Sequence, residues 1–305
     1  MTRITHRLVA SLAILIGVTF LTFLLAFAIP SDPARTVAGP KADAETLANV
    51  RRELGLDRPL LEQYALYLDR LVHGDFGRSY LTRQSVLQAI VERLGATAYL
   101  ATTSLVLAAF VGIALGCASA AQQGSTLERL MLGSTLLGLS LPAFWVGLML
   151  LYVFAYRLRL LPLGGVGLIN VILPATALAI GNAAYYARLV HTNVRDVLQL
   201  DYVRTARAKG VAPLVVYGRH ALRNALLPVV TLLGLDLAGL MSGVVLTETI
   251  FNWPGIGRLA VEAVFNQDIP MVMGTVLFSA LLIVAANIVV DALYAIIDPR
   301  LRLES

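Results

Sequence analysis

The residues that could carry out chemistry are few, and they do not converge along the sequence. A phosphate-binding loop needs a lysine followed by serine or threonine, but Lys41 precedes alanine and Lys209 precedes glycine. Cys117 is the only cysteine, which excludes an intramolecular disulfide and a cysteine-based metal cluster. The histidines fall outside the long apolar runs or at their edges, without metal-ligand spacing: His6, His73, His191 and His220. We predict no catalytic residue, no metal site and no cofactor bound by this chain.

One carboxylate lies deep inside an apolar run. Asp236 is about ten residues into the run 226–250, hence roughly 15 Å from its end at 1.5 Å per residue. A charge at that depth is costly and usually faces a bundle interior or a wet cavity. Asp236 is therefore a candidate for a translocation path, and the alternative is a buried polar contact with a neighbouring helix.

A polar stretch, residues 201–224, is the most informative segment, and we call it the handle. Asp201 and Arg204 can pair at i, i+3 on a short helix, which Gly210 would end. Pro213 can start a second short helix. A rigid projection of this kind suits docking into a groove of another protein, and the alternative is an ordinary basic loop at the membrane surface.

Hydrophobic helices must position these residues. The chain is 58% hydrophobic and 14% charged, whereas soluble domains are about 25% charged. Six apolar runs are long enough to cross a hydrocarbon core of about 30 Å. They are residues 8–29, 96–121, 130–156, 171–190, 226–250 and 271–297. We predict an all-α integral membrane protein with six transmembrane helices, forming a single membrane domain over residues 1–305.

Basic residues indicate the orientation. With six spans, most lysines and arginines of the short loops share the side of both termini, and the opposite short loops hold only Arg157, Arg159 and Arg258. The positive-inside rule then predicts that both termini are cytoplasmic in a multi-pass plasma-membrane protein. This pattern explains the formal net charge of +5 without a nucleic-acid partner.

Residues 30–95 fall on the extracytoplasmic side by alternation of the spans. Asp43 can cap a short helix that Gly55 ends, and Pro59 can start a second apolar stripe that stops at Gly74. We predict a small extracytoplasmic helical insertion between the first two spans. It serves either as a lid on the membrane domain or as a docking surface for a soluble partner.

The handle contains Arg204-Thr205-Ala206 and Gly210, followed after nine residues by His220-Ala221-Leu222-Arg223. This pattern resembles the permease signature of binding-protein-dependent ABC importers, without its acidic residue and final proline. The variant is similar to the dipeptide, oligopeptide and nickel permease subfamily. Further matches cover essentially the whole chain: GDFGRS at 74–79, LPAFW at 141–145, TETIFNWPGIGR at 247–258 and YAIIDPR at 294–300. One departure is Gly95, where the family commonly has proline.

The resemblance implies a type I ABC importer permease (MetI-like) fold in a prokaryotic inner membrane, in contact with lipid. The chain would pair with a second homologous permease, as a heterodimer, and form half of a translocation pathway. Two ABC ATPases would bind ATP and Mg²⁺ below it. A binding protein above it would deliver dipeptides, oligopeptides, nickel chelates or related small solutes. The chain itself would be a transport subunit and not an enzyme.

Specific residues follow from the same resemblance. Residues 191–225 would form the cytoplasmic coupling-helix loop, with these candidate contacts to an ATPase: Asp201, Arg204, Thr205, Ala206, Lys209, Gly210, His220 and Asn224. Candidates for the pathway or a gate, besides Asp236, are Pro142, Glu248, Trp253 and Pro254. Trp253 is equally explained as an interfacial anchor. Glu248 either attracts a peptide amine or a cation, or pairs with Arg258.

Two other classes compete with this interpretation. A secondary transporter or channel would work without an ATPase, but a proton-coupled carrier usually places several ionisable groups deep in its spans, and here Asp236 is the clear deep one. A membrane enzyme would need a nucleophile, a base or metal ligands inside the spans. Neither class accounts for the handle.

Overall fold

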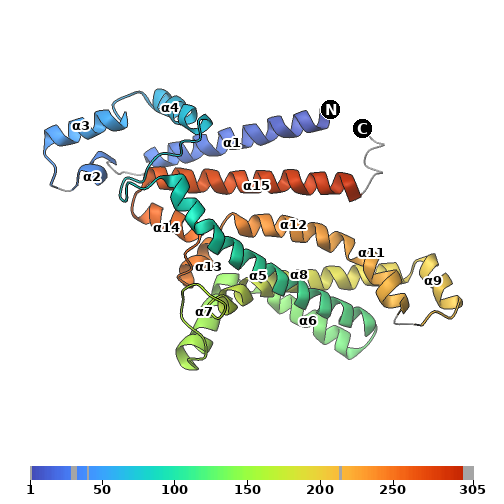
Figure 1. Ribbon diagram of the computed structural model, residues 1–305. Helices are drawn as coiled ribbons and strands as arrows, with labels where there is room; N and C mark the ends of the chain where they lie inside the picture. Colours follow the sequence, from blue (N-terminus) through green and yellow to red (C-terminus); the bar gives the residue numbers. More distant parts are fainter. Residues whose placement is uncertain (1, 29–32, 40, 213–214, 298–305) are drawn as a thin grey trace. The chain divides into compact units, whose positions relative to one another are not determined.

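The computed structural model describes residues 2–28, 33–39, 41–212 and 215–297 (Figure 1). Its elements are helices joined by turns and loops, which confirms the predicted all-α fold class. Extended pairing within the described residues is limited to one bridge between Arg78 and Ser85. The chain divides into two compact units: the first holds residues 1–97, 241–245 and 254–285, and the second holds the rest.

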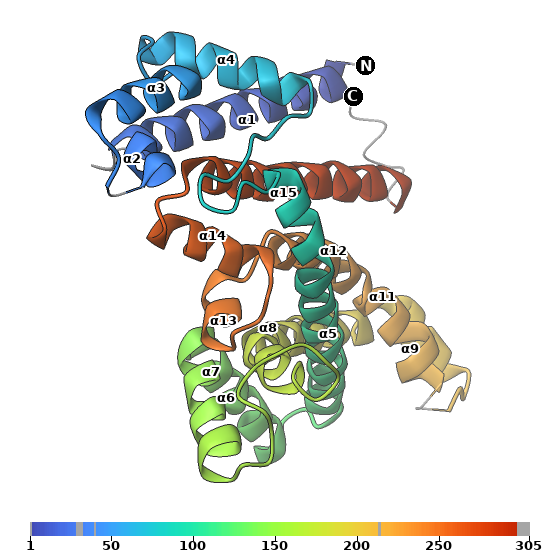
Figure 2. The ribbon, with the colours of Figure 1, turned by 60° about the vertical axis from the view of Figure 1, so that its left-hand side comes forward.

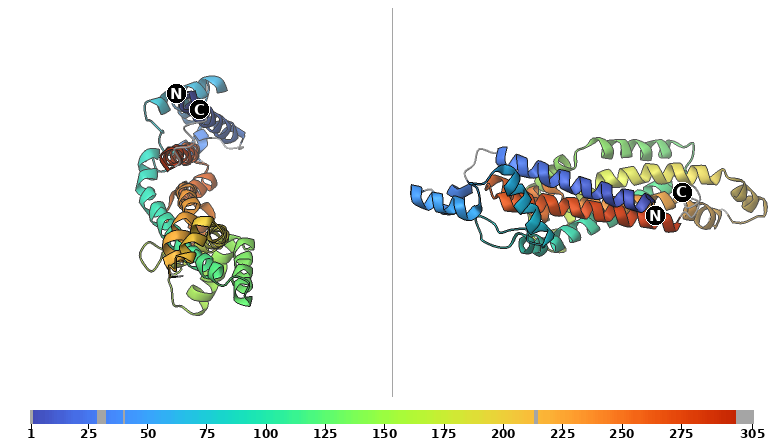
Figure 3. Two further views of the ribbon diagram at one scale, coloured as in Figure 1. Left: turned by 90° about the vertical axis from the view of Figure 1, so that its right-hand side faces the viewer. Right: turned by 90° about the horizontal axis from the view of Figure 1, so that it is seen from above.

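The first unit is built around the helices that begin and end the chain. Its helices are α1 (Thr2–Ala28), α2 (Pro33–Ala38), α3 (Ala44–Leu54), α4 (Leu60–Val72), the start of α5 (Val86–Ala121), α14 (Ile256–Phe265) and most of α15 (Ile269–Ile297). Figures 1 and 3 show α1 beside α15, where Phe23 packs with Ile269 and Met273. Helix α4 lies against α1, since the Phe23 and Tyr64 rings are 5.3 Å apart.

Local capping fixes α3, the first of the two short helices that the sequence predicts in the segment 30–95. The Asp43 carboxylate accepts the Thr46 N–H at 2.9 Å, and Gly55 ends α3 at φ 70°. The hydrogen bonds from Thr46 hold the pKa of Asp43 below its ordinary value, so this cap acts at neutral pH and is lost as the pH falls. Both predicted helices are confirmed, and their extracytoplasmic placement stays a prediction.

A buried carboxylate anchors the loop that follows α4. Asp268 is 4% exposed. It accepts the Ser79 hydroxyl at 2.5 Å and the Tyr80 N–H at 3.0 Å. The Ser79 oxygen in turn accepts the N–H groups of Leu81 and Thr82. These bonds join a loop in the first third of the chain to the residue preceding α15, so the GDFGRS motif has a structural role in the first unit.

The second unit surrounds α8 (Ile172–Leu198). Its other helices are the rest of α5, then α6 (Thr126–Ser140), α7 (Ala143–Leu150), a π-helical segment Leu151–Arg157, α9 (Asp201–Ala208), a second π-helical segment Val216–Leu222, α11 (Arg223–Ala225), α12 (Leu227–Met241) and α13 (Val245–Ile250). Figure 2 shows α8 beside α5 and α6. Many buried residues of α8 are alanines, such as Ala179, Ala183 and Ala187, which lets neighbouring backbones approach closely.

Two glycines on α5 lie directly against α8. A Cβ at Gly112 would lie 2.7 Å from both the Ala183 carbonyl oxygen and the Tyr186 Cβ. A Cβ at Gly116 would lie 2.6 Å from the Ala187 carbonyl oxygen. Glycines four residues apart are a known signal for close helix packing in membranes. The α5–α8 contact therefore requires glycine at both positions.

The runs 130–156 and 226–250 are not the continuous spans that the sequence predicted. The first bends by 97° between α6 and α7, because Leu141 is extended before Pro142 and proline lacks the N–H that would continue the helix. The second ends as α12 at Met241, and Gly243 follows at φ 108°. An added Cβ there would lie 2.9 Å from the Gly257 nitrogen, so this break also requires glycine.

Membrane-spanning character is clearest for two helices. Two helical segments of the described residues are long and apolar enough to cross a bilayer by themselves: Val86–Ala121 and Ile269–Ile288. The number of candidate spans rises to four if each of two bent helix pairs is counted as one span. Val9–Leu25 is a shorter apolar helix. Each predicted run contains helix, and the count of six spans stays a prediction.

Replacing Asp268 tests the anchor in the first unit. Asp268→Ala removes the acceptor for Ser79 and Tyr80, and unsatisfied buried donors cost about 1–3 kcal/mol. We expect a lower unfolding temperature in detergent for Asp268→Ala. Asp69→Ala is the control, since this carboxylate is 70% exposed and should change stability little. Equal melting of the two variants would contradict the anchoring role.

Replacing Gly112 tests the α5–α8 contact. Gly112→Ala inserts a methyl group against backbone, and overpacking of this kind costs about 1–3 kcal/mol. Gly95→Ala is the matched control on the same helix, because nothing lies within 4 Å of its added Cβ. We expect Gly95→Ala to be neutral or stabilising, since alanine favours helix by about 1 kcal/mol over glycine. Thermal unfolding in detergent measures both, and a neutral Gly112→Ala would exclude the close approach.

Candidate functional site

The first half of the handle is a closed, short helix. Helix α9 runs over Asp201–Ala208, and Gly210 follows at φ 75°. The Gly210 N–H bonds to the Arg207 carbonyl and the Val211 N–H to the Ala206 carbonyl, at 3.0 and 3.2 Å. This is a Schellman motif, in which glycine supplies the left-handed residue that ends a helix. The prediction that Gly210 ends this helix is confirmed.

A small apolar cluster makes the handle rigid. Val203, Ala206 and Val216 are buried together, with Val197, Leu198 and Val211 packed against them. Ala206 is only 8% exposed, so packing within the handle accounts for its small size. Gly210 lies in open space, with nothing within 4 Å of an added Cβ. Contact of either residue with an ATPase stays a prediction.

The polar handle residues divide into bonded and solvent-facing groups. Asn224 Nδ2 donates to the Tyr202 hydroxyl at 2.8 Å, which ties α11 to α9. The predicted Asp201–Arg204 pair forms at 3.7 Å with both side chains exposed, so it contributes little stability. Thr205 donates its hydroxyl to the Asp201 carbonyl oxygen, and Lys209 is exposed. Pro213 and the His220 side chain lie outside the described residues.

The handle is continuous with α8 and also contacts α5. The Tyr217 hydroxyl donates to the Cys117 carbonyl oxygen at 2.6 Å. Asn193 Nδ2, on α8, donates to the Ala225 carbonyl oxygen at 3.1 Å. Movement of the handle would therefore pull on both α5 and α8.

A buried polar cluster joins α5, α6 and α8 two turns before the end of α8. His191 Nδ1 lies 3.0 Å from Ser119 Oγ, and His191 Nε2 lies 3.3 Å from Glu128 Oε1. Glu128 also accepts the Gly124 N–H at 2.6 Å. Sequence reasoning left His191 without a role. Its partners Ser119 and Glu128 are remote from it in sequence, so no local pattern indicated this cluster.

Asp236 contacts a neighbouring helix and also lines a cavity. Its carboxylate accepts the hydroxyl of Tyr186 on α8. Asp236, Asn182 and Tyr185 contribute the polar groups to a cavity of about 550 Å³ that is otherwise lined by apolar residues and glycines. The geometry is compatible with both roles that the sequence left open, and a pathway role stays a prediction.

The other gate candidates lie in different settings. Trp253 is fully buried and stacks on Tyr99, with centroids 6.0 Å apart, which favours a packing role over an interfacial anchor. Glu248 is also fully buried, and Arg258 donates to Glu262 at 2.7 Å. Pro142 begins α7. Pro254 starts the last segment of the first unit, directly after Trp253.

Two substitutions separate the packing role of Asp236 from its charge. Asp236→Ala leaves the buried Tyr186 hydroxyl without its acceptor, which costs about 1–3 kcal/mol. Asp236→Asn keeps a carbonyl acceptor and removes the charge. We expect thermal unfolding in detergent to be lowered more by the alanine variant. Equal melting temperatures for both variants would contradict the packing role.

Comparison with known proteins identifies the family. Residues 112–303 match the model of the binding-protein-dependent transport system inner membrane component, and residues 1–101 match the N-terminal model of such membrane components. The chain is 41% identical over 300 residues to the glutathione transport system permease protein GsiC of Salmonella paratyphi A and to that of Escherichia coli K12. In each case, 98% of both chains is covered.

A solved structure shares the fold. An inward-facing MetNI methionine ABC transporter chain superposes with a TM-score of 0.53 at 16% identity, covering 68% of this chain and 96% of that chain. The predicted MetI-like fold is confirmed. The chain belongs to the family of binding-protein-dependent transport system inner membrane components and is the permease subunit of an ABC importer, whose ATPase is a separate subunit.

Proposed function

We propose that this permease forms half of a pathway for dipeptides and oligopeptides delivered by an extracytoplasmic binding protein. Similarity to glutathione permeases over 98% of the chain supports a peptide substrate, because glutathione is itself a peptide. Nickel chelates or related small solutes are the alternative cargo. A second homologous permease completes the pathway as a heterodimer, and two ABC ATPases bind ATP and Mg²⁺.

The observation that carries the mechanism is the closed construction of the handle. Its helix ends in a Schellman motif, its apolar cluster is buried, and Asn224 bonds to Tyr202 across it. An element braced in this way moves as a rigid body when a partner pulls on it. With both termini cytoplasmic, the handle faces the ATPases, and their ATP-driven closure tilts α8 and α5 between inward-open and outward-open states.

Gly210→Val tests the handle. Valine at φ 75° costs about 1–2 kcal/mol in the left-handed region, so the turn after α9 should distort. We expect substrate-stimulated ATP hydrolysis of the reconstituted importer to fall toward its basal rate. Gly210→Asn should retain more stimulation, because asparagine tolerates this backbone conformation.

Gly39→Val is the matched control for Gly210→Val. Gly39 has φ 90°, has nothing within 4 Å of an added Cβ, and follows α2, far from the handle in the sequence. It should strain a turn outside the handle and leave coupling intact, while recovery of the assembled complex controls for folding. Full stimulation by Gly210→Val, or uptake by this chain alone without nucleotide, would overturn the proposed mechanism.

A further inference from the structure

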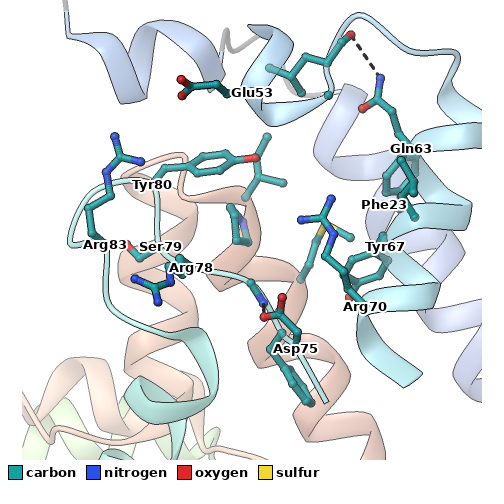
Figure 4. A pocket seen from close by; sticks show the side chains of 18 residues that line it. Phe23, Glu53, Gln63, Tyr67, Arg70, Asp75, Arg78, Ser79, Tyr80 and Arg83 are labelled. Carbon is teal, nitrogen blue, oxygen red and sulfur yellow. Dashed lines mark hydrogen bonds between the residues drawn. The ribbon is translucent and has the colours of Figure 1, made fainter. Parts of the chain in front are cut away.

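The first unit contains a second cavity, separate from the one beside Asp236. It has a volume of about 680 Å³ and lies among α3, α4, the loop after α4 and the start of α15 (Figure 4). Small-molecule sites usually have volumes of about 300–1,000 Å³. All of its lining residues belong to the first unit, and no role assigned above uses this cavity.

Five charged side chains line this cavity, and one of them, Asp75, accepts the Gly77 N–H at 2.9 Å. Arg70, Arg78 and Arg83 line it and are exposed, and within the described part of the chain their side chains make no hydrogen bond or ion pair. Glu53, at the end of α3, lines it too and is likewise unpaired among the described residues. Guanidinium groups in a concave site favour a carboxylate, which they can bind with two parallel hydrogen bonds.

Figure 4 shows how these groups are placed. Arg70 extends from α4 toward the middle of the cavity, and the Tyr80 ring extends into it from the opposite side. Arg83 and Glu53 lie beyond Tyr80. Burial raises the pKa of the Tyr80 phenol, the Asp268 carboxylate raises it further, and the Arg70 charge lowers it. The Tyr80 phenol therefore keeps its proton at neutral pH, and its O–H can donate a hydrogen bond to an anionic ligand.

Contacts within the first unit fix the residues on two sides of the cavity. Ser79 and the Tyr80 backbone are bonded to the buried Asp268, and Tyr67 stacks on Phe23 with centroids 6.5 Å apart. Arg83 has φ 59°, a conformation that few non-glycine residues adopt. Fixed aromatic walls with a few convergent polar groups are characteristic of ligand sites.

We propose that this cavity binds a short peptide, with the peptide's terminal carboxylate at Arg70 and Tyr80 and its amino group at Glu53. The proposal rests on the proposed function and adds a substrate site outside the translocation path. Both ends of a zwitterionic peptide find a group of opposite charge, and the aromatic walls can pack against its side chains. Opposite charges at separated positions inside a concave site suit a small zwitterionic ligand better than the surface of a docked protein.

The test uses the assembled importer in nanodiscs, without its binding protein, and trialanine as the probe. Titrations followed by saturation-transfer NMR compare the free peptide with its C-terminal amide and its N-acetyl form. We expect the free peptide to bind about tenfold more tightly than the amide, the size of effect that one charge-assisted hydrogen bond supplies. Arg70→Gln should abolish this preference, and Glu53→Gln should abolish the preference over the N-acetyl form.

Arg52→Gln is the matched control. Like Arg70→Gln, it removes one positive charge, but Arg52 is on α3, does not line the cavity and donates to Asn49. Arg52→Gln should therefore keep the preference for the free peptide over its amide. The proposal is overturned if trialanine does not bind, if acid and amide bind equally to the unmodified importer, or if Arg70→Gln keeps the difference. A loss of binding-protein capture in Arg70→Gln, with no trialanine bound, would instead identify a docking surface. ATP-driven uptake with the binding protein, measured on the same preparations, tests the proposed function separately.

Discussion

The close approach of α5 and α8 organises the second unit. Lipid supplies no hydrophobic drive between helices, so their association depends on packing and interhelical hydrogen bonds. Gly112 and Gly116 leave no room for a side chain against α8. Tyr186 packs on Gly112 and donates its hydroxyl to Asp236 on α12. One backbone contact thus positions three helices and the deep carboxylate between them.

Helix α8 connects this contact to the handle. His191 joins α8 to Ser119 on α5 and to Glu128 on α6, and Asn193 bonds to the chain just beyond the handle. Polar groups buried in this way are costly unless their partners stay in place, so they favour a single arrangement of the helices around them. This packing supports the proposal that displacement of the handle moves the helices as a unit.

Features encoded within a few residues could be predicted from the sequence. The Asp43 and Gly55 caps, the end of α9 at Gly210 and the all-α class followed from local rules of capping and hydropathy. The break at Pro142 could have been predicted from the residue alone, because proline disfavours helix at the residue before it. Hydropathy concealed it, since apolar residues continue on both sides of the bend.

Contacts between distant segments were decided by the tertiary structure. The pairing of Ser79 with Asp268 and the convergence of Arg70, Tyr80 and Glu53 on one cavity join residues with no shared sequence period. The burial of Trp253 and Ala206 likewise depends on which surfaces meet. The sequence by itself determined the helical, membrane-embedded class, the handle and the family motifs, because hydropathy and capping act over one helix. Packing partners required the folded chain, because many surfaces of similar polarity could have met.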